Sequence, residues 1–511
     1  MVDSDSHENG RRSGVSRRRF VQAAGASGVA VGLAGCISSG GDGGSDGGDG
    51  GNGSGDGGAI DTSAPEGDVT VRWAADTRVA DNAQAIRDAM SSAGLPDNIS
   101  VEIVAGSQVT DNRQSQYQQW LSANREEPTL LMMDSGWTIP FIVREQLQNL
   151  SQALPSSMTD TINNEYFEAS VSTAKHPDTG DLYGMPLFPD FPTVQYRKDL
   201  MREAGYSDSD FESWATESMT WQDFSTAVSE TVSASDNSDL MGFTFQASVY
   251  EGLSCCDFNE FMTSFGGAYF GSHENLFGPV GDRPITVDEE PVLESIRMVR
   301  SLINGPDADN AMEGIQNIAP EAVLQWTEEP SRAPFMNGNV VAHRNWPYSI
   351  NAAGAEEAFG EDLGVMPIPY GVPASEAEYE GTGGPVAALG GWHMTMNPNA
   401  PDEQKQAALQ VMQVMQKEQF QLDLFGIIGW IPPRPSLLDS DQASEVDVIG
   451  RYLPQLKVAG ENAVPRPVTA VWPQQSGPIA QQVNNAYAGN KTPEQAMSDL
   501  KSTLEQIEQN A

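Results

Sequence analysis

One stretch of the chain, residues 182–205 with the sequence LYGMPLFPDFPTVQYRKDLMREAG, constrains the fold more than any other. Three prolines keep its first half extended, because proline lacks a backbone N–H and disfavours helical geometry in the residue before it. Residues 193–196 predict a strand, and a short helix should begin at Lys198 and end at Gly205. This order is typical of a strand that leaves one folded body and enters another.

An acidic residue lies in the middle of this stretch. Asp190 is flanked by Phe188 and Phe191, which predicts that it forms the floor of a cleft between two bodies. The alternative is a solvated loop aspartate between two phenylalanines of the core. The local sequence leaves both interpretations open.

The charge balance excludes several classes of partner. Among the 511 residues, 28 are Lys or Arg and 71 are Asp or Glu, which gives a net charge of −43. The acidic residues are spread along the chain, so the whole surface repels nucleic acid and anionic lipid. This self-repulsion is screened in about 1 M salt, where the Debye length is about 3 Å. We therefore expect a haloarchaeal type of protein from a salt-rich environment, the alternative being an acidic protein from a low-salt source.

The N-terminal region predicts export and lipid anchoring. Residues 16–22 resemble the twin-arginine export motif, and the apolar run after them is too short to span a membrane. Residues 33–36, LAGC, resemble the lipobox of exported lipoproteins, in which the cysteine thiol takes the lipid. We expect a signal peptide over residues 1–35 and a flexible Gly/Asp/Ser tether over 36–67, with Cys36 as the lipid anchor on the outer face of the cell membrane.

Strands and helices alternate through the first part of the folded region. Strands are predicted at 69–73, 99–104 and 129–133, with helices at 82–90 and 111–122 between them. This alternation predicts an α/β lobe. The third strand is entirely apolar, as expected at the buried centre of a sheet.

Two side chains with binding potential follow that central strand. Open α/β sheets bind ligands at the carboxyl ends of their strands, where Asp134 and Trp137 lie. Asp134 can accept hydrogen bonds from two hydroxyls, and Trp137 offers a flat apolar face to a sugar ring. Alternatively, Asp134 caps a helix predicted at 139–145.

A series of motifs in this order resembles family 1 extracellular solute-binding proteins of ABC importers, above all their trehalose/maltose-binding branch. The resemblance covers residues 68–511 and rests on YG-x-P…YRKDL…AG at 183–205, TW-x-D-F at 220–224, YEGL at 250–253, F-x-x-G…WPY at 335–348, GGW at 390–392 and G-x-x-P-x-R at 429–434.

The resemblance implies a fold, which is a two-lobed α/β periplasmic-binding-protein architecture of type II, similar to maltose-binding protein, with three crossings between the lobes. The N-lobe would comprise residues 68–188 and 392–428. The C-lobe would comprise residues 189–391 and 429–511.

The resemblance also implies a set of ligand-binding residues. Tryptophans at the strand ends and crossings would stack on sugar rings, the glycine pair would let the backbone approach the ligand, and an arginine would bind paired hydroxyls. A phenylalanine stands at 188, where the sugar binders often carry tyrosine. The candidate residues are Asp134, Trp137, Phe188, Asp190, Glu251, Trp346, Gly391, Trp392, Trp430 and Arg434.

The function implied is that of a receptor without catalytic activity, metal or cofactor. A monomer would bind a sugar, such as the oligosaccharides maltose or trehalose, and deliver it to the permease of an ABC transporter. One alternative is an exported glycoside hydrolase, which needs two carboxylates about 5–9.5 Å apart. Another is a receptor for a polyol, glycerol phosphate or a peptide.

Two adjacent cysteines, Cys255 and Cys256, are the only cysteines apart from Cys36. Adjacent cysteines can form a disulfide in an exported protein. We favour the other state, two buried reduced thiols.

Overall fold

The computed structural model describes residues 59–511. The predicted signal peptide, the predicted anchor Cys36 and most of the predicted tether lie outside these residues. Among the described residues, no helix has both the length and the apolar character needed to cross a bilayer.

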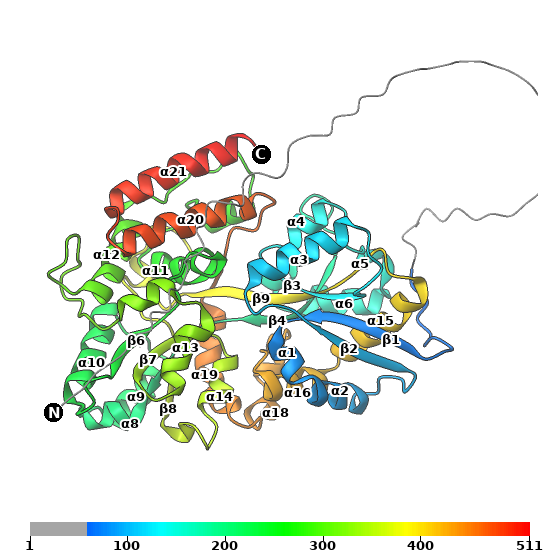
Figure 1. Ribbon diagram of the computed structural model, residues 1–511, viewed down its shortest axis with the longest axis horizontal. Helices are drawn as coiled ribbons and strands as arrows, with labels where there is room; N and C mark the ends of the chain where they lie inside the picture. The colour runs from blue at the N-terminus through cyan, green and yellow to red at the C-terminus, as the bar shows by residue number, and fades with distance from the viewer. Residues whose placement is uncertain (1–58) are drawn as a thin grey trace, which may run out of the picture. The chain divides into compact units, whose positions relative to one another are not determined.

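The first lobe is built on a mixed sheet in which the order of strands is β10-β9-β3-β1-β2, with β4 also paired to β9 (Figure 1). At one edge this sheet continues into the second lobe, where Val464 of β10 joins an apolar cluster of that lobe. Strand β1 is parallel to both β2 and β3, whereas β9 runs antiparallel to β3 and β4. The strands are β1 (Val69–Ala75), β2 (Ile99–Ala105), β3 (Leu130–Asp134), β4 (Gly184–Asp190), β9 (Ala387–Met396) and β10 (Ala463–Pro465). Every residue of β3 is buried, as the apolar sequence predicts for a central strand.

Helices pack on this sheet and enclose a core that contains Trp73, Leu131 and Met394. Helix α15 lies against β1, and α16 lies against α2. The helices that contribute to this core are α1 (Thr77–Asp81), α2 (Ala83–Ser92), α3 (Thr110–Ser122), α4 (Thr138–Val143), α5 (Leu150–Ala153), α6 (Ser156–Glu165), α7 (Glu168–Ser172), α15 (Asp402–Met415) and α16 (Glu418–Ile428).

The second lobe is built on a four-stranded sheet with the order β6-β7-β5-β8. Strand β5 pairs antiparallel with β7 and β8, and β6 pairs parallel with β7. The strands are β5 (Thr193–Arg197), β6 (Met241–Thr244), β7 (Val340–Asn345) and β8 (Leu363–Met366).

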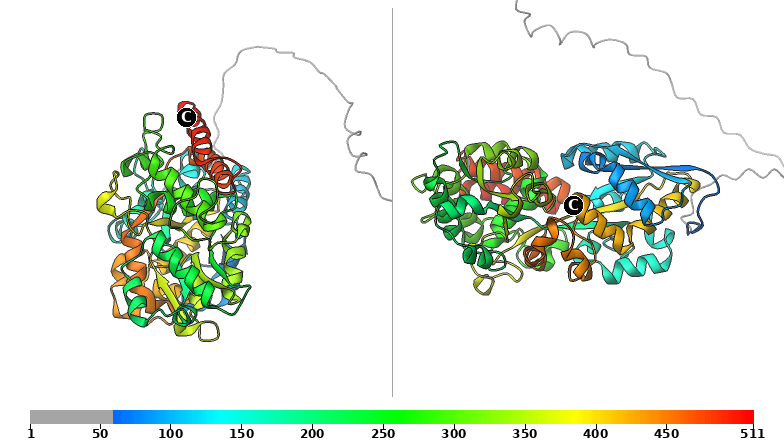
Figure 2. Two further views of the ribbon diagram at one scale, coloured as in Figure 1. Left: turned by 90° about the vertical axis from the view of Figure 1, so that its left-hand side faces the viewer. Right: turned by 90° about the horizontal axis from the view of Figure 1, so that it is seen from below.

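The helices of the second lobe enclose two further apolar clusters. Figure 1 shows α20 and α21 side by side, and these two helices pack on each other. The left view of Figure 2 shows the red α21 ending at the C-terminus. The helices are α8 (Lys198–Glu203), α9 (Asp208–Trp214), α10 (Trp221–Ala234), α11 (Phe258–Ser264), α12 (Glu290–Asn304), α13 (Glu328–Met336), α14 (Tyr348–Ala353), α17 (Pro435–Leu438), α18 (Asp441–Ser444), α19 (Leu453–Glu461), α20 (Trp472–Tyr487) and α21 (Pro493–Gln509).

The chain passes between the two sheets where the proline-rich stretch predicts a crossing. Strand β4 belongs to the first sheet and β5 to the second, with only residues 191–192 between them. The chain returns between β8 of the second sheet and β9 of the first. It leaves the first lobe again after α16, where Gly429 ends the helix in a left-handed conformation with a φ of +81°.

Local sequence signals place several element boundaries correctly. Thr220 caps α10 by accepting a hydrogen bond from the backbone N–H of Asp223, and Thr492 caps α21 in the same way. The last long helix pair differs from expectation in one respect. We expect a helix from Ile479, after Pro478, but α20 begins at Trp472 and contains that proline. Packing of α20 against α12 and α21 offsets the helical hydrogen bond that a proline cannot donate.

Candidate functional site

A cavity lies where the strand ends of the first sheet meet the second lobe. It encloses about 740 Å³ of space free of protein atoms, including the open solvent at its mouth. From the first lobe and the crossings it is lined by Asp76, Arg78, Gln108, Thr110, Asp134, Phe188, Asp190, Gly390, Gly391, Trp392, Gly429 and Trp430. From the second lobe and the segment after β10 it is lined by Tyr250, Glu251, Gly252, Cys255, Cys256, Glu328, Trp346, Tyr348 and Arg466.

Eight of the ten residues expected from the sequence line this one cavity. They come from six separate parts of the chain, which the fold brings together. They are Asp134, Phe188, Asp190, Glu251, Trp346, Gly391, Trp392 and Trp430. Their contact with a ligand remains a prediction.

The other two expected residues lie outside the lining of the cavity. Trp137 is fully buried behind Trp392, with the two rings edge to face at a centroid distance of 6.3 Å. Arg434 is buried beside Tyr166, and its guanidinium pairs with Glu165 at 3.1 Å. Trp137 is therefore a core residue, and the charge of Arg434 is engaged elsewhere, so neither belongs to the proposed site.

An ion cluster joins the two sides of the cavity. Arg466 Nη1 lies 2.8 Å from Asp134 Oδ1 in the first lobe and 3.0 Å from Glu251 Oε1 in the second. The backbone N–H of Gly136 also donates to Asp134, and the indole N–H of Trp472 donates to Glu251. Burial raises the pKa of Glu251 to about 7, although Arg466 opposes this shift.

The hydrogen bonds of Asp134 show that this residue does not cap the helix that follows it. Asp134 accepts from Gly136 in a tight turn, whereas α4 begins four residues later without a side-chain cap. A larger residue at Gly136 would displace Arg466 from this cluster, because a Cβ there would lie 2.4 Å from Arg466 Nη1.

A second contact between the lobes lies on another side of the cavity. The guanidinium of Arg78 lies over the ring of Tyr348, 4.2 Å from its centroid. Arg78 also pairs with Asp76 at 3.1 Å, and Asp76 caps α1 by accepting from the N–H of Val79. Both arginines that line the cavity, Arg78 and Arg466, are thus already paired with carboxylates.

Asp190 differs from the other cavity carboxylates. It ends β4 and is half-buried, and within residues 59–511 no hydrogen bond or ion pair engages its carboxylate. Burial raises its pKa to about 8, with Arg78 and Arg344 acting in the opposite direction. Its carboxyl group is therefore available to a ligand.

Aromatic side chains form the apolar part of the wall. Phe188 and Trp430 are stacked with ring centroids 4.4 Å apart, and Trp73 supports Trp430 from behind, edge to face. Trp392 lies between Trp137 and the guanidinium of Arg113, which sits 4.2 Å from its ring centroid. These contacts fix the rings before any ligand arrives.

The glycine pair on β9 allows close packing within the wall. A Cβ at Gly390 would come within 2.9 Å of the Trp346 ring. Gly391 has a φ of +128°, and a Cβ there would lie 2.7 Å from the carbonyl oxygen of Phe188. Larger residues at either position would displace the side chains that shape the cavity.

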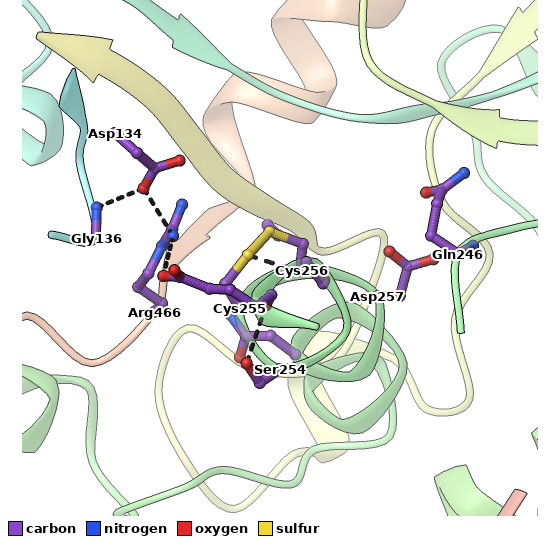
Figure 3. The surroundings of a disulfide bond; sticks show 12 residues. Asp134, Gly136, Gln246, Ser254, Cys255, Cys256, Asp257 and Arg466 are labelled. Atoms are coloured by element: carbon purple, nitrogen blue, oxygen red, sulfur yellow. Dashed lines mark hydrogen bonds and ion pairs between the residues drawn. A yellow bond between two sulfur atoms is a disulfide. The ribbon is translucent and has the colours of Figure 1, made fainter. Parts of the chain in front are cut away.

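The state of the adjacent cysteines differs from our expectation. Cys255 and Cys256 form a disulfide with an S–S distance of 2.09 Å, rather than two reduced thiols. They lie on the π-helical turn Leu253–Asp257 and line the cavity close to Asp134 and Arg466 (Figure 3). The expectation was wrong because nothing in the local sequence indicates that this turn brings both sulfurs to a bonding distance.

Sequence reasoning missed several other cavity residues. Arg466 lies between two prolines and belongs to no motif that we identified. Arg78 follows the first strand, and Tyr250 directly precedes the candidate residue Glu251. Their closeness in sequence to a strand end and to a candidate residue is the signal that could have identified them. Tyr348 and Glu328 lie at the starts of α14 and α13.

Comparison with known proteins gives consistent results. The family model described as bacterial extracellular solute-binding protein matches residues 96–447. A probable ABC transporter-binding protein of Deinococcus radiodurans is 29% identical over 314 residues, which span 60% of this chain. The aligned part covers 63% of that relative's length.

Solved structures match over most of the chain. The maltose-bound MalE3 protein of T. maritima has a TM-score of 0.70 at 24% identity, covering 85% of this chain and 98% of its own. A solute-binding protein of Thermotoga lettingae bound with α-D-tagatose has a TM-score of 0.67 at 18% identity, covering 86% and 99%. The GacH receptor of Streptomyces glaucescens, studied with acarbose, has a TM-score of 0.66 at 17% identity, covering 86% and 98%. These matches establish the two-lobed fold of maltose-binding-protein type.

Proposed function

Because the chain belongs to the family of bacterial extracellular solute-binding proteins, we propose that it is a sugar receptor that delivers its ligand to the permease of an ABC transporter. The observation that carries the proposal is the cavity between the lobes, which combines aromatic faces with the carboxyl group of Asp190, a group that no hydrogen bond or ion pair engages among residues 59–511. A pyranose has apolar C–H faces and a rim of hydroxyls, so both kinds of surface suit it.

The chemistry of the wall favours a neutral ligand. Five carboxylates line the cavity, whereas its two arginines are both occupied by carboxylates. A phosphate or another anion would find no unpaired arginine in this wall, and Glu328, which forms no ion pair with the described residues, would repel it. Maltose, tagatose and acarbose in the matched structures are in keeping with a carbohydrate, and maltose or trehalose is our first choice of ligand.

Binding would stabilise the closed arrangement of the lobes. A solute that touches Trp392 and Asp190 on one side and Glu251 on the other gains contacts only when both lobes face it. Such differential affinity shifts a hinge equilibrium towards closure. The permease would then recognise the closed form, and the protein itself would leave the sugar unchanged.

We also propose that the receptor is a monomer held at the outer face of the cell membrane by lipid on Cys36. The proposal rests on the LAGC box and on the Gly/Asp/Ser-rich tract after it. Substitution of Cys36→Ser should release the protein into the medium with its fold intact. Membrane partitioning that persists in this variant would remove the lipid from the account.

A thermal-shift screen in about 1 M KCl tests the choice of ligand. Maltose, trehalose, ribitol and inorganic phosphate form its four arms. We expect a disaccharide to raise the melting temperature, because a ligand that binds only the folded state stabilises it by mass action. Stabilisation by phosphate alone, or by ribitol alone, would overturn the sugar assignment while leaving a solute receptor.

A further inference from the structure

We propose that the Cys255–Cys256 disulfide is a ligand-contacting surface, an apolar face that the second lobe presents to the sugar in addition to Trp346. This inference rests on the proposed sugar-binding function of the cavity. Both cysteines line it, and the residue before their turn, Gly252, lines it too. The aromatic rings of Phe188, Trp392 and Trp430 belong to the other side, so the disulfide together with Trp346 would form the opposing apolar wall.

The chemistry of the bonded pair suits a C–H surface. Neither sulfur of a disulfide carries a hydrogen, so neither donates a hydrogen bond, and both are polarizable atoms that pack well on apolar groups. The polar groups beside it are occupied with one another, since Arg466 already pairs with Asp134 and Glu251. The disulfide is therefore an apolar patch surrounded by polar groups. A sugar ring has the same arrangement, because its apolar C–H face is surrounded by hydroxyls.

The turn that carries the disulfide is held firmly at both ends. Glu251, just before it, accepts from Arg466 and from the indole of Trp472. Asp257, at its end, accepts from the backbone N–H of Gln246 at 2.9 Å and lies 3.4 Å from Arg344 Nη1. A surface fixed in this way loses little conformational freedom when a ligand binds to it.

A cross-linking role explains the bond less well. A disulfide stabilises a fold mainly by closing a loop in the unfolded chain, and the effect grows with loop length. Cys255 and Cys256 are neighbours in sequence, so their bond closes no loop of intervening residues and joins no separate elements. A binding role, in contrast, explains why the disulfide lies in the wall of the cavity.

Reduction provides a way to remove this surface without mutation. A dithiol such as dithiothreitol would transfer two electrons and two protons, leaving two cysteine thiols and the cyclic disulfide of the reagent. The wall would then present S–H groups and be free to rearrange. We expect reduction to weaken sugar binding.

The test is isothermal titration of maltose into the mature protein in about 1 M KCl, oxidised and after quantitative reduction. The double variant Cys255→Ala/Cys256→Ala is titrated beside them. Ser254→Ala serves as the matched control, since Ser254 is buried on the same turn and does not line the cavity. We expect about tenfold weaker binding for the reduced protein and the double variant, equivalent to about 1.4 kcal/mol, and unchanged binding for the control.

The outcomes separate this inference from the function on which it rests. If oxidised protein binds maltose and both the reduced protein and the double variant bind it equally well, the disulfide is no contact surface, and the receptor function stands. If the double variant fails to fold, the reduced wild type decides alone. If oxidised wild-type protein binds none of the sugars in the thermal-shift screen, the proposed function fails first.

Discussion

Replacing Arg466 tests the ion cluster that joins the two sides of the cavity. Arg466→Met keeps most of the side-chain volume but removes the charge, leaving Asp134 and Glu251 without a cation. Their side chains are 9% and 7% exposed, so water compensates poorly. Removing one partner of a buried ion pair costs about 3–5 kcal/mol. Each carboxylate retains one hydrogen bond, from Gly136 or Trp472, so we expect the lower end, about 3 kcal/mol of unfolding free energy.

The loss should depend on pH with a defined sign. Burial raises the pKa of Glu251 to about 7, against a usual value of 4.5, and without Arg466 it would rise further. A folded state that holds a proton more tightly than the unfolded chain loses stability as the pH rises through this range. At pH 5 the variant can protonate Glu251, so Arg466→Met should cost less there than at pH 8.

Denaturant unfolding of the ligand-free protein in about 1 M KCl, at pH 5 and at pH 8, measures both effects. The matched controls are Arg466→Lys, which keeps the charge, and the double variant Arg466→Met/Glu251→Gln, which removes one of the stranded carboxylates. The double variant should recover part of the loss at pH 8. A cost below about 1 kcal/mol at pH 8, typical of an exposed pair, would refute the buried bridge.

Three further predictions concern the cavity and the surface. In Asp190→Asn the decrease in unfolding free energy between pH 4 and pH 8 should diminish, because the raised pKa of about 8 makes the native state lose stability over that range. An unchanged pH profile would exclude the raised pKa of Asp190. Trp392→Ala should weaken sugar affinity by about 1–3 kcal/mol, whereas Trp137→Ala should lower only stability, by about 3–5 kcal/mol; equal affinities in titration would remove Trp392 from the site. With a net charge of −43, the protein should lose its far-UV circular dichroism on dialysis into dilute buffer, and a cooperative fold that persists there would contradict the halophilic interpretation.

The sequence predicts most of the fold because its signals are local. The alternation of strands and helices, the proline-rich crossing and the threonine caps at 220 and 492 all correspond to elements of the structure. The start of α20 is not predicted correctly. Helix propensity alone places the start after Pro478, whereas tertiary packing keeps this proline inside the helix.

The cavity is predicted less completely because side-chain direction and pairing are not local properties. Trp137 follows β3, and Trp392 lies within β9 opposite Asp134. Only Trp392 lines the cavity, whereas Trp137 packs behind it. Arg434 belongs to a motif but pairs with Glu165, whereas Arg466, which belongs to none, bridges the lobes. Such assignments depend on which segments meet in space.

The central claim is that this protein binds a sugar between its lobes without transforming it. Isothermal titration of maltose and trehalose into the wild-type protein in about 1 M KCl, followed by chromatography of the recovered sugar, tests it most directly. We predict saturable binding at one site per chain and recovery of the intact disaccharide. Release of glucose would establish a hydrolase instead, and the absence of binding heat with both sugars, at several temperatures, would contradict the claim.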